Sequence, residues 1–169
     1  MSLNTKIFAS LTAELSSALD LASATSSLDK SLQISLTNGT TAGKADVLWH
    51  DQRTLAASAS EDLDLAGSLS GILGGTVSFA KVKALLVAAN AGNTNDVVVG
   101  NAASNGFVGP FGAAAHTVKV SPGGLLLMAA PGTAGLGSVT AGTGDLLHIA
   151  NSSSGSAVTY QIVIVGTSA

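Results

Sequence analysis

The chain has 169 residues, enough for one core, and Asp, Glu, Lys and Arg together make up only 10% of it, against roughly 25% in an average soluble protein. With seven basic residues, a net charge of −3 and a mean hydropathy of +0.48, it lacks both the cationic surface that nucleic acids require and the composition of a disordered chain. It has no cysteine, and apolar stretches such as residues 125–130 are far short of the roughly 20 residues that span a bilayer. We therefore expect a folded protein with no nucleic-acid and no membrane partner.

Two hydrophobic periods compete in the N-terminal segment. Its apolar residues fit one face of a helix, but the alternation over residues 10–15 fits a strand equally well. We leave both structures open. In either case the segment is amphipathic, so we expect it to pack on its own sheet or on a neighbouring subunit, and the candidate interface residues in it are Ile7, Phe8, Leu11 and Leu15.

The segment that follows is rich in Ser over residues 22–30, and we interpret it as a linker. The expected organisation is an N-terminal arm and linker over residues 1–30 and a β domain over residues 31–169. The N-terminus lacks the basic, apolar and cleavage-site order of a signal peptide, so we expect synthesis in the cytoplasm.

From residue 31 onward the sequence predicts strands. Residues 31–37 alternate apolar and polar side chains and stop at Asn38-Gly39, a dipeptide that favours a tight turn, so we expect the return strand at residues 46–55. Clusters of Gly, Asn, Ser and Pro separate the remaining candidates, which are residues 61–66, 76–89, 96–100, 116–120, 125–130, 145–150 and 157–166. About eight short strands without a helical pattern between them predict an all-β fold, an antiparallel β-sandwich or jelly roll.

The last of these strands is apolar on both faces, because Val163 and Val165 alternate with Ile162 and Ile164. Both faces therefore need cover, and a sister subunit could supply one of them.

Two lysines in the fourth strand admit two interpretations. If residues 61–66 and 76–89 pair as antiparallel neighbours, one register places Asp64 opposite Lys81 and Asp62 opposite Lys83. In the alternative, Lys81 and Lys83 face an acidic partner surface, which makes them candidate interface residues.

We find no catalytic residues and predict no cofactor and no metal. The histidines His50, His116 and His148 stand alone, whereas a cupin-type metal site needs a His-x-His pair on one strand. His148 is the best remaining candidate ligand.

Four stretches resemble structural proteins of tailed bacteriophages: HDQRTLAAS at 50–58, EDLDLAG at 61–67, NTNDVVVG at 93–100 and VKVSPGG at 118–124. Among such proteins the chain is most similar to the jelly-roll cement or decoration proteins, which sit on the outside of the capsid and clamp neighbouring major capsid subunits.

This resemblance implies a non-enzymatic virion protein on the capsid surface. Its implied partners are the major capsid protein and further copies of itself, as a dimer or a trimer. Two alternatives stay open: a tail or fibre component, because these proteins share the same Ala-, Ser-, Gly- and Thr-rich composition, and a cupin-like metalloprotein that uses His148.

Overall fold

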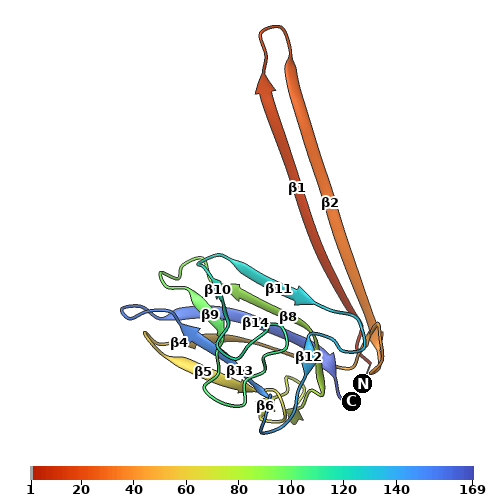
Figure 1. Cartoon of the computed structure of the whole chain (residues 1–169), viewed down its shortest axis with the longest axis vertical. Coiled ribbons are helices and arrows are strands. Elements are labelled where there is room, and N and C mark those ends of the chain that lie inside the picture. The colour runs from red at the N-terminus through yellow and green to blue at the C-terminus, as the bar shows by residue number, and fades with distance from the viewer. Residues whose placement is uncertain (1) are drawn as a thin grey trace.

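The computed structural model describes residues 2–169, and within them the chain is all-β, with fourteen strands and no helix (Figure 1). No described segment could therefore cross a membrane as a helix. The strands are β1 (Thr5–Ala18), β2 (Ser23–Asn38), β3 (Lys44–Ala45), β4 (Val47–Leu55), β5 (Ser60–Asp64), β6 (Leu69–Ser70), β7 (Thr76–Val77), β8 (Lys81–Ala89), β9 (Val97–Gly100), β10 (Thr117–Val120), β11 (Leu125–Ala129), β12 (Gly137–Ser138), β13 (Leu146–Asn151) and β14 (Val158–Thr167).

Two antiparallel sheets form the body of the molecule. One has the order β10-β9-β13-β5, and the other has the order β11-β8-β14-β4, with the short β12 also paired to β8. Apolar side chains from both sheets form one continuous buried cluster, so the main core lies between the sheets. Its members include Trp49, Leu63, Val87, Val99, Leu147, Ile149, Tyr160 and Ile162.

Nearly all the predicted strands of the body are present, with ends within two residues of the predicted ones. The exception is the stretch 76–89, which is interrupted. Phe79 is buried there and donates its backbone N–H to the carbonyl of Leu65, 2.8 Å away. This contact separates β7, which pairs with β6, from β8, which belongs to the larger sheet.

Two predicted strand pairings are wrong. The strand before Asn38-Gly39 does not return into residues 46–55, because β2 pairs with β1 upstream of it while β4 pairs with β14. The strand of Asp62 and Asp64 does not pair with that of Lys81 and Lys83 either: β5 pairs with β13, and β8 lies in the other sheet. The predicted Asp–Lys pairs therefore do not exist.

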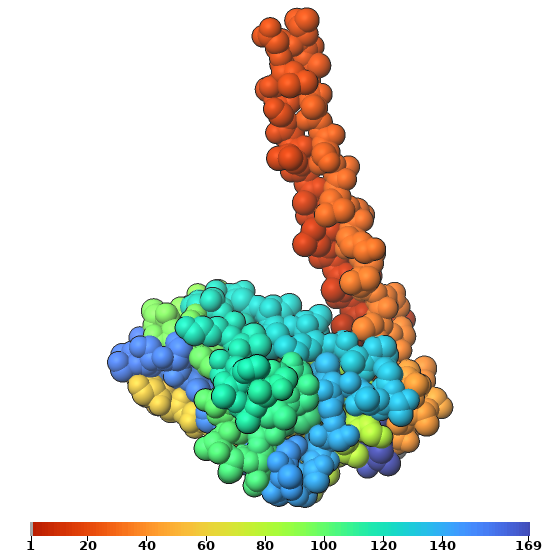
Figure 2. All heavy atoms as spheres, viewed as in Figure 1, coloured from red at the N-terminus to blue at the C-terminus, as the bar shows by residue number. Residues whose placement is uncertain are grey.

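Of the two structures left open for the N-terminal segment, the strand is present as β1, whereas the linker predicted after it is not. β1 and β2 form a long antiparallel hairpin that extends away from the body as an arm (Figures 1 and 2). Residues 23–30, predicted as linker, are the first half of β2, which runs through residue 30 without interruption. At 14 residues, β1 alone is about 45 Å long.

Candidate functional site

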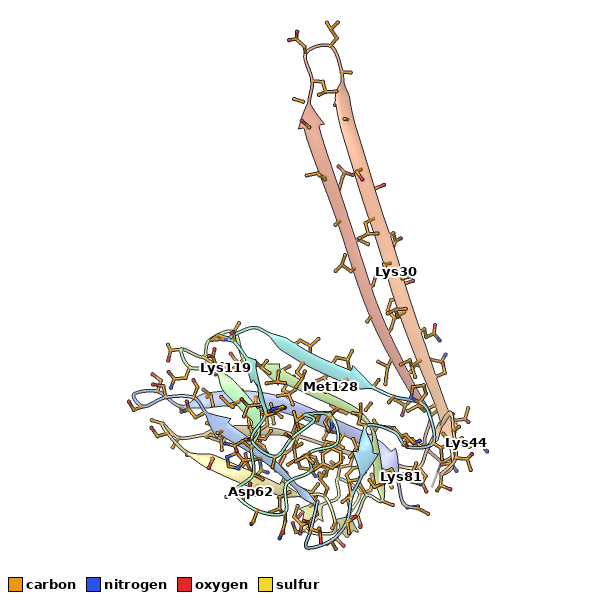
Figure 3. All side chains as sticks on the ribbon, in the orientation of Figure 1. Lys30, Lys44, Asp62, Lys81, Lys119 and Met128 are labelled. Carbon is orange, nitrogen blue, oxygen red and sulfur yellow. The ribbon has the colours of Figure 1, made fainter. Side chains whose placement is uncertain are left out.

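The register of the arm separates its side chains into two faces. β1 and β2 pair from Thr5 opposite Leu36 to Ala18 opposite Ser23. Because side chains alternate along a strand, odd-numbered residues of β1 share a face with the even-numbered residues of β2 opposite them. This apolar arm face consists chiefly of Ile7, Ala9, Leu11, Ala13, Leu15, Leu28, Leu32, Ile34 and Leu36, with Lys30 as its one charged residue (Figure 3).

The apolar arm face is uncovered over most of its length. The exposed fractions are 58% for Leu11, 76% for Leu15, 53% for Leu28 and 62% for Leu32. An isolated two-stranded hairpin is marginally stable in water, and a contiguous exposed apolar patch marks a site of interaction. We therefore identify the apolar arm face as the candidate functional site.

The root of the arm is fixed to the body by a second apolar cluster. Leu36 is almost fully buried in this cluster with Ala84 and Val165, and Ile7 and Ile34 pack against it. The same cluster includes Leu48 and Ala129, so the root lies across β4, β14, β8 and β11 on the outer face of the larger sheet. The predicted need for cover on the second face of the last strand is thus met in part by the chain's own arm.

An open cleft lies beside this root. It measures about 280 Å³ and separates residues Thr5 to Phe8 of β1 from the outer face of the larger sheet, where Leu86, Leu127 and Val163 line it. β1 is the edge strand of its sheet, so its second edge is unpaired and borders the cleft. The structure therefore places a free strand edge next to an apolar cavity.

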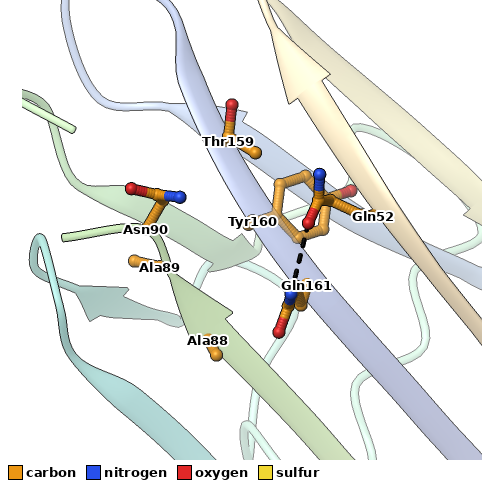
Figure 4. A pocket seen from close by; sticks show the side chains of 7 residues that line it. All are labelled: Gln52, Ala88, Ala89, Asn90, Thr159, Tyr160 and Gln161. Carbon is orange, nitrogen blue, oxygen red and sulfur yellow. Dashed lines mark hydrogen bonds between the residues drawn. The ribbon is translucent and has the colours of Figure 1, made fainter. Parts of the chain in front are cut away.

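The far end of the outer face is polar. A small cavity of about 130 Å³ is lined there by residues that include Gln52, Asn90, Thr159 and Gln161, and Gln161 Nε2 donates to Gln52 Oε1 at 3.2 Å (Figure 4). The outer face thus changes from apolar beside the arm to polar away from it.

The tip of the arm is also apolar. The N–H of Leu19 donates to the carbonyl of Ala22, 2.7 Å away, and closes a turn around Asp20 and Leu21. The side chain of Leu21 is 99% exposed.

The four predicted arm residues do not share one face. Ile7, Leu11 and Leu15 belong to the apolar arm face, whereas Phe8 lies on the opposite face, across from Gln33. Sequence reasoning did not assign Leu28 and Leu32 to an interface, because Leu28 falls in the stretch interpreted as a linker and Leu32 in a predicted strand of the β domain. Part of the signal was present: Leu28 is in phase with Leu32, Ile34 and Leu36, but the charged Lys30 interrupts the alternation between them.

Lys83 is not available to a partner, so its assignment as an interface residue is wrong. Opposite β14 the register shifts, and Ala84 pairs with Val165 while Val82 pairs with Gly166. This bulge leaves Lys83 unpaired, and its fully buried side chain donates through Nζ to the carbonyls of Gly132 and Thr133.

Burial lowers the pKa of the Lys83 ammonium group from its ordinary value, and the neighbouring charge of Lys81 lowers it further. Lys81 itself is partly exposed, and its place in an interface stays a prediction.

The three histidines lie apart. His148 Nδ1 is 2.6 Å from Oδ1 of Asp62, its cross-strand neighbour on β5, and His116 Nδ1 is 2.7 Å from the carbonyl oxygen of Phe111. His50 is exposed on β4. Within residues 2–169 no three His, Asp or Glu side chains gather as a metal-ligand set. That the protein binds no metal stays a prediction.

A polar network joins the two large sheets at one margin. Glu61 on β5 accepts hydrogen bonds from Arg53 Nε at 2.6 Å and from the Tyr160 hydroxyl at 2.7 Å. Arg53 also bonds Asp51 at 2.9 Å. Burial raises the pKa of Tyr160, as does its bond to Glu61, and the bond to Glu61 raises that of Arg53. This network links strands of the two sheets, and Asp51 and Arg53 also line a cavity of about 220 Å³ beside it.

No protein-family model, no curated protein and no solved structure matches the chain. Its function is therefore inferred from its own geometry, chiefly from the apolar arm face and the cleft beside the arm root.

Proposed function

We propose that the protein is a non-enzymatic structural component of a tailed bacteriophage virion. In this proposal it is a jelly-roll cement protein that binds the outside of the capsid and clamps neighbouring major capsid subunits. The observation that carries the proposal is the long hairpin arm, whose apolar face is exposed over most of its length.

The strand order supports the jelly-roll assignment. If the eight longer strands of the body are ranked in chain order, the larger sheet reads first, eighth, third, sixth from β4 to β11. The other sheet reads second, seventh, fourth, fifth from β5 to β10. Successive strands thus alternate between sheets for most of the chain, as they do when two Greek keys are wrapped into a jelly roll.

The arm supports an assembly role. It holds an apolar surface far from the body, on a hairpin whose direction is fixed by the buried contacts of Leu36. A protein that binds several neighbours at once gains avidity without a deep site, and an arm that extends from the body provides a second, separate contact.

The first test is location. Cryo-EM of purified virions that carry the protein should show its two-sheet body on the outside of the capsid. Density on the tail or fibres instead, or absence from virions, would contradict the cement role.

The second test is binding to capsids stripped of the protein. Replacing Leu11 and Leu15 by Thr removes apolar side chains but keeps β propensity, and we expect at least roughly ten-fold weaker binding for the loss of two such contacts. The control variant replaces Ser10 and Ser16 by Thr on the opposite face of the same strand. Equal binding by both variants would show that the apolar arm face does not contribute.

A further inference from the structure

The outer edge of β1 carries backbone groups that its own sheet does not use. Along an antiparallel ladder, hydrogen-bonded residue pairs alternate with pairs that share no hydrogen bond. Because Leu19 is hydrogen-bonded to Ala22 opposite it, the odd-numbered residues of β1 are the ones in hydrogen-bonded pairs with β2. Even-numbered residues from Lys6 to Glu14 therefore point their N–H and C=O groups away from β2. In agreement, the N–H of Thr37, which lies across from an even-numbered position, donates away from β1 to Gly43.

We propose that this edge pairs with the same edge of a second copy of the chain. The two β1 strands run antiparallel about a two-fold axis at Ser10, so that Ser10 lies opposite Ser10 of the partner subunit. Lys6 then lies opposite Glu14 of the partner subunit, and Phe8 lies opposite Thr12 of the partner subunit. Every one of these pairs is even-numbered, so the free N–H and C=O groups of the two edges meet.

Charge and size both favour this register. Within residues 2–169 no ion pair holds Lys6 or Glu14, and the proposed register gives each of them an opposite charge. A shift of either strand leaves both charges without that partner. The same register places Ile7 opposite an Ala and Leu11 opposite an Ala, so large side chains meet small ones.

The cleft beside the arm root fits the incoming strand. The partner strand passes along residues Thr5 to Phe8, which form one wall of the cleft. Leu15 of the partner subunit lies opposite Thr5, on the same face as Ile7, which already points to the outer face of the larger sheet. Its side chain therefore enters the cleft against Leu86, Leu127 and Val163.

By symmetry each arm covers the cleft of the other body, and the polar far end of the outer face stays in water. This inference rests on the role of the arm as an assembly element in the proposed function, and it names a second copy as the occupant of the free edge. The experiments below distinguish this occupant from a strand of the capsid protein at the same edge.

The absence of cysteine makes the test direct. In an antiparallel bonded pair the Cα atoms are about 5.5 Å apart, within the range for a disulfide. Ser10→Cys should therefore form an intermolecular disulfide under mild oxidation of the purified chain. Ser16→Cys is the matched control, since it has the same face, residue type and exposure, but it would lie about 40 Å from its symmetry mate.

Charge reversal gives an independent measurement. Lys6→Glu places like charges opposite each other twice in the dimer, and we expect dimerisation roughly ten-fold weaker by analytical ultracentrifugation at low salt. The double variant Lys6→Glu, Glu14→Lys restores opposite pairs and should recover wild-type affinity. All these positions are exposed on the arm, so the body should fold in each variant.

A monomeric wild-type chain at tens of micromolar, or a Ser16→Cys disulfide that forms as fast as that of Ser10→Cys, would overturn the inference. These results are independent of location. A protein found on capsids whose Ser10→Cys variant does not cross-link overturns only the pairing of arms, and a cross-linked dimer absent from virions overturns only the proposed function.

Discussion

Tyr160 on β14 donates a hydrogen bond from its hydroxyl to Oε1 of Glu61 on β5, 2.7 Å away, and so joins the two large sheets. The rest of the Tyr160 side chain is buried in the core between them. Glu61 also accepts from Arg53 on β4, so three strands meet at one carboxylate.

This bond predicts how stability depends on alkaline pH. The pKa of Tyr160 is raised above its ordinary 10.0, so the folded state holds this proton more tightly than the unfolded state. The contribution of Tyr160 to the free energy of unfolding is therefore complete below pH 10 and is lost as the pH rises further. Tyr160→Phe should lower the free energy of unfolding at pH 7 by about 1.5–3 kcal/mol and abolish this component of the decline above pH 10. Urea denaturation of the wild type and the variant at pH 7, 10 and 11 measures the free energy of unfolding. If it declines equally in both proteins above pH 10, the prediction is contradicted.

Lys83 predicts the opposite dependence. Its pKa is lowered below the ordinary 10.5, so the unfolded state binds the proton more tightly, and stability rises as pH approaches 10.5. Lys83→Met should lack this rise.

The same substitution removes the donor that holds the carbonyls of Gly132 and Thr133. We expect the amide of Gly135 in this loop to exchange roughly ten-fold faster, as for the loss of one charged hydrogen bond. Unchanged exchange at Gly135, measured by NMR, would show that Lys83 does not hold the loop.

The strands of the body could be predicted because most of them have one face in the core. The alternation of Leu63 with Asp62 and Asp64, for example, follows directly from burial on one side. The partners of these strands could not be predicted in the same way. Charge matching predicted that β5 pairs with β8. The chain instead crosses between the two sheets after β5, so that β5 and β8 lie in different sheets with the core between them.

Lys83 shows a second limit of periodicity. In a regular strand Lys81 and Lys83 would share a face, but the bulge opposite Val165 and Gly166 breaks the alternation between them. A bulge depends on the partner strand, so the sequence of β8 alone does not reveal it.

The arm shows a third limit. Ile7, Leu11 and Leu15 of its apolar face were predicted, but Ser-rich residues 23–27 are typical of a loop. They form a strand because β1 pairs with them residue by residue. The turn residues Asp20 and Leu21 carry no strong hairpin signal such as Asn-Gly.

A close backbone contact predicts intolerance to a single methyl group. Gly166 lies beside the bulge, where an added Cβ would clash with the carbonyl oxygen of Lys81 and approach Phe79 Cδ1 to 2.7 Å. Gly166→Ala should destabilise the fold by about 1–3 kcal/mol. At Gly132 nothing lies within 4 Å of an added Cβ, so Gly132→Ala should change stability by less than about 0.5 kcal/mol. Thermal denaturation compares the two variants, and equal losses would be inconsistent with the packing at Gly166.

Shortening the arm should separate folding from association. Ala9 and Leu32 lie directly opposite each other in a hydrogen-bonded pair, so replacing residues 10–31 by Asn-Gly closes the hairpin with a favoured two-residue turn. The removed side chains are all exposed, while Ile7, Ile34 and Leu36 keep the arm root on the larger sheet. We therefore expect the body to unfold cooperatively with a Tm within a few degrees of the full chain. Because most of the apolar arm face is gone, the same variant should bind less of a hydrophobic dye and sediment as a monomer. A shortened chain that unfolds without cooperativity would mean that the body depends on the arm, and one that still self-associates would place the contact elsewhere on the body.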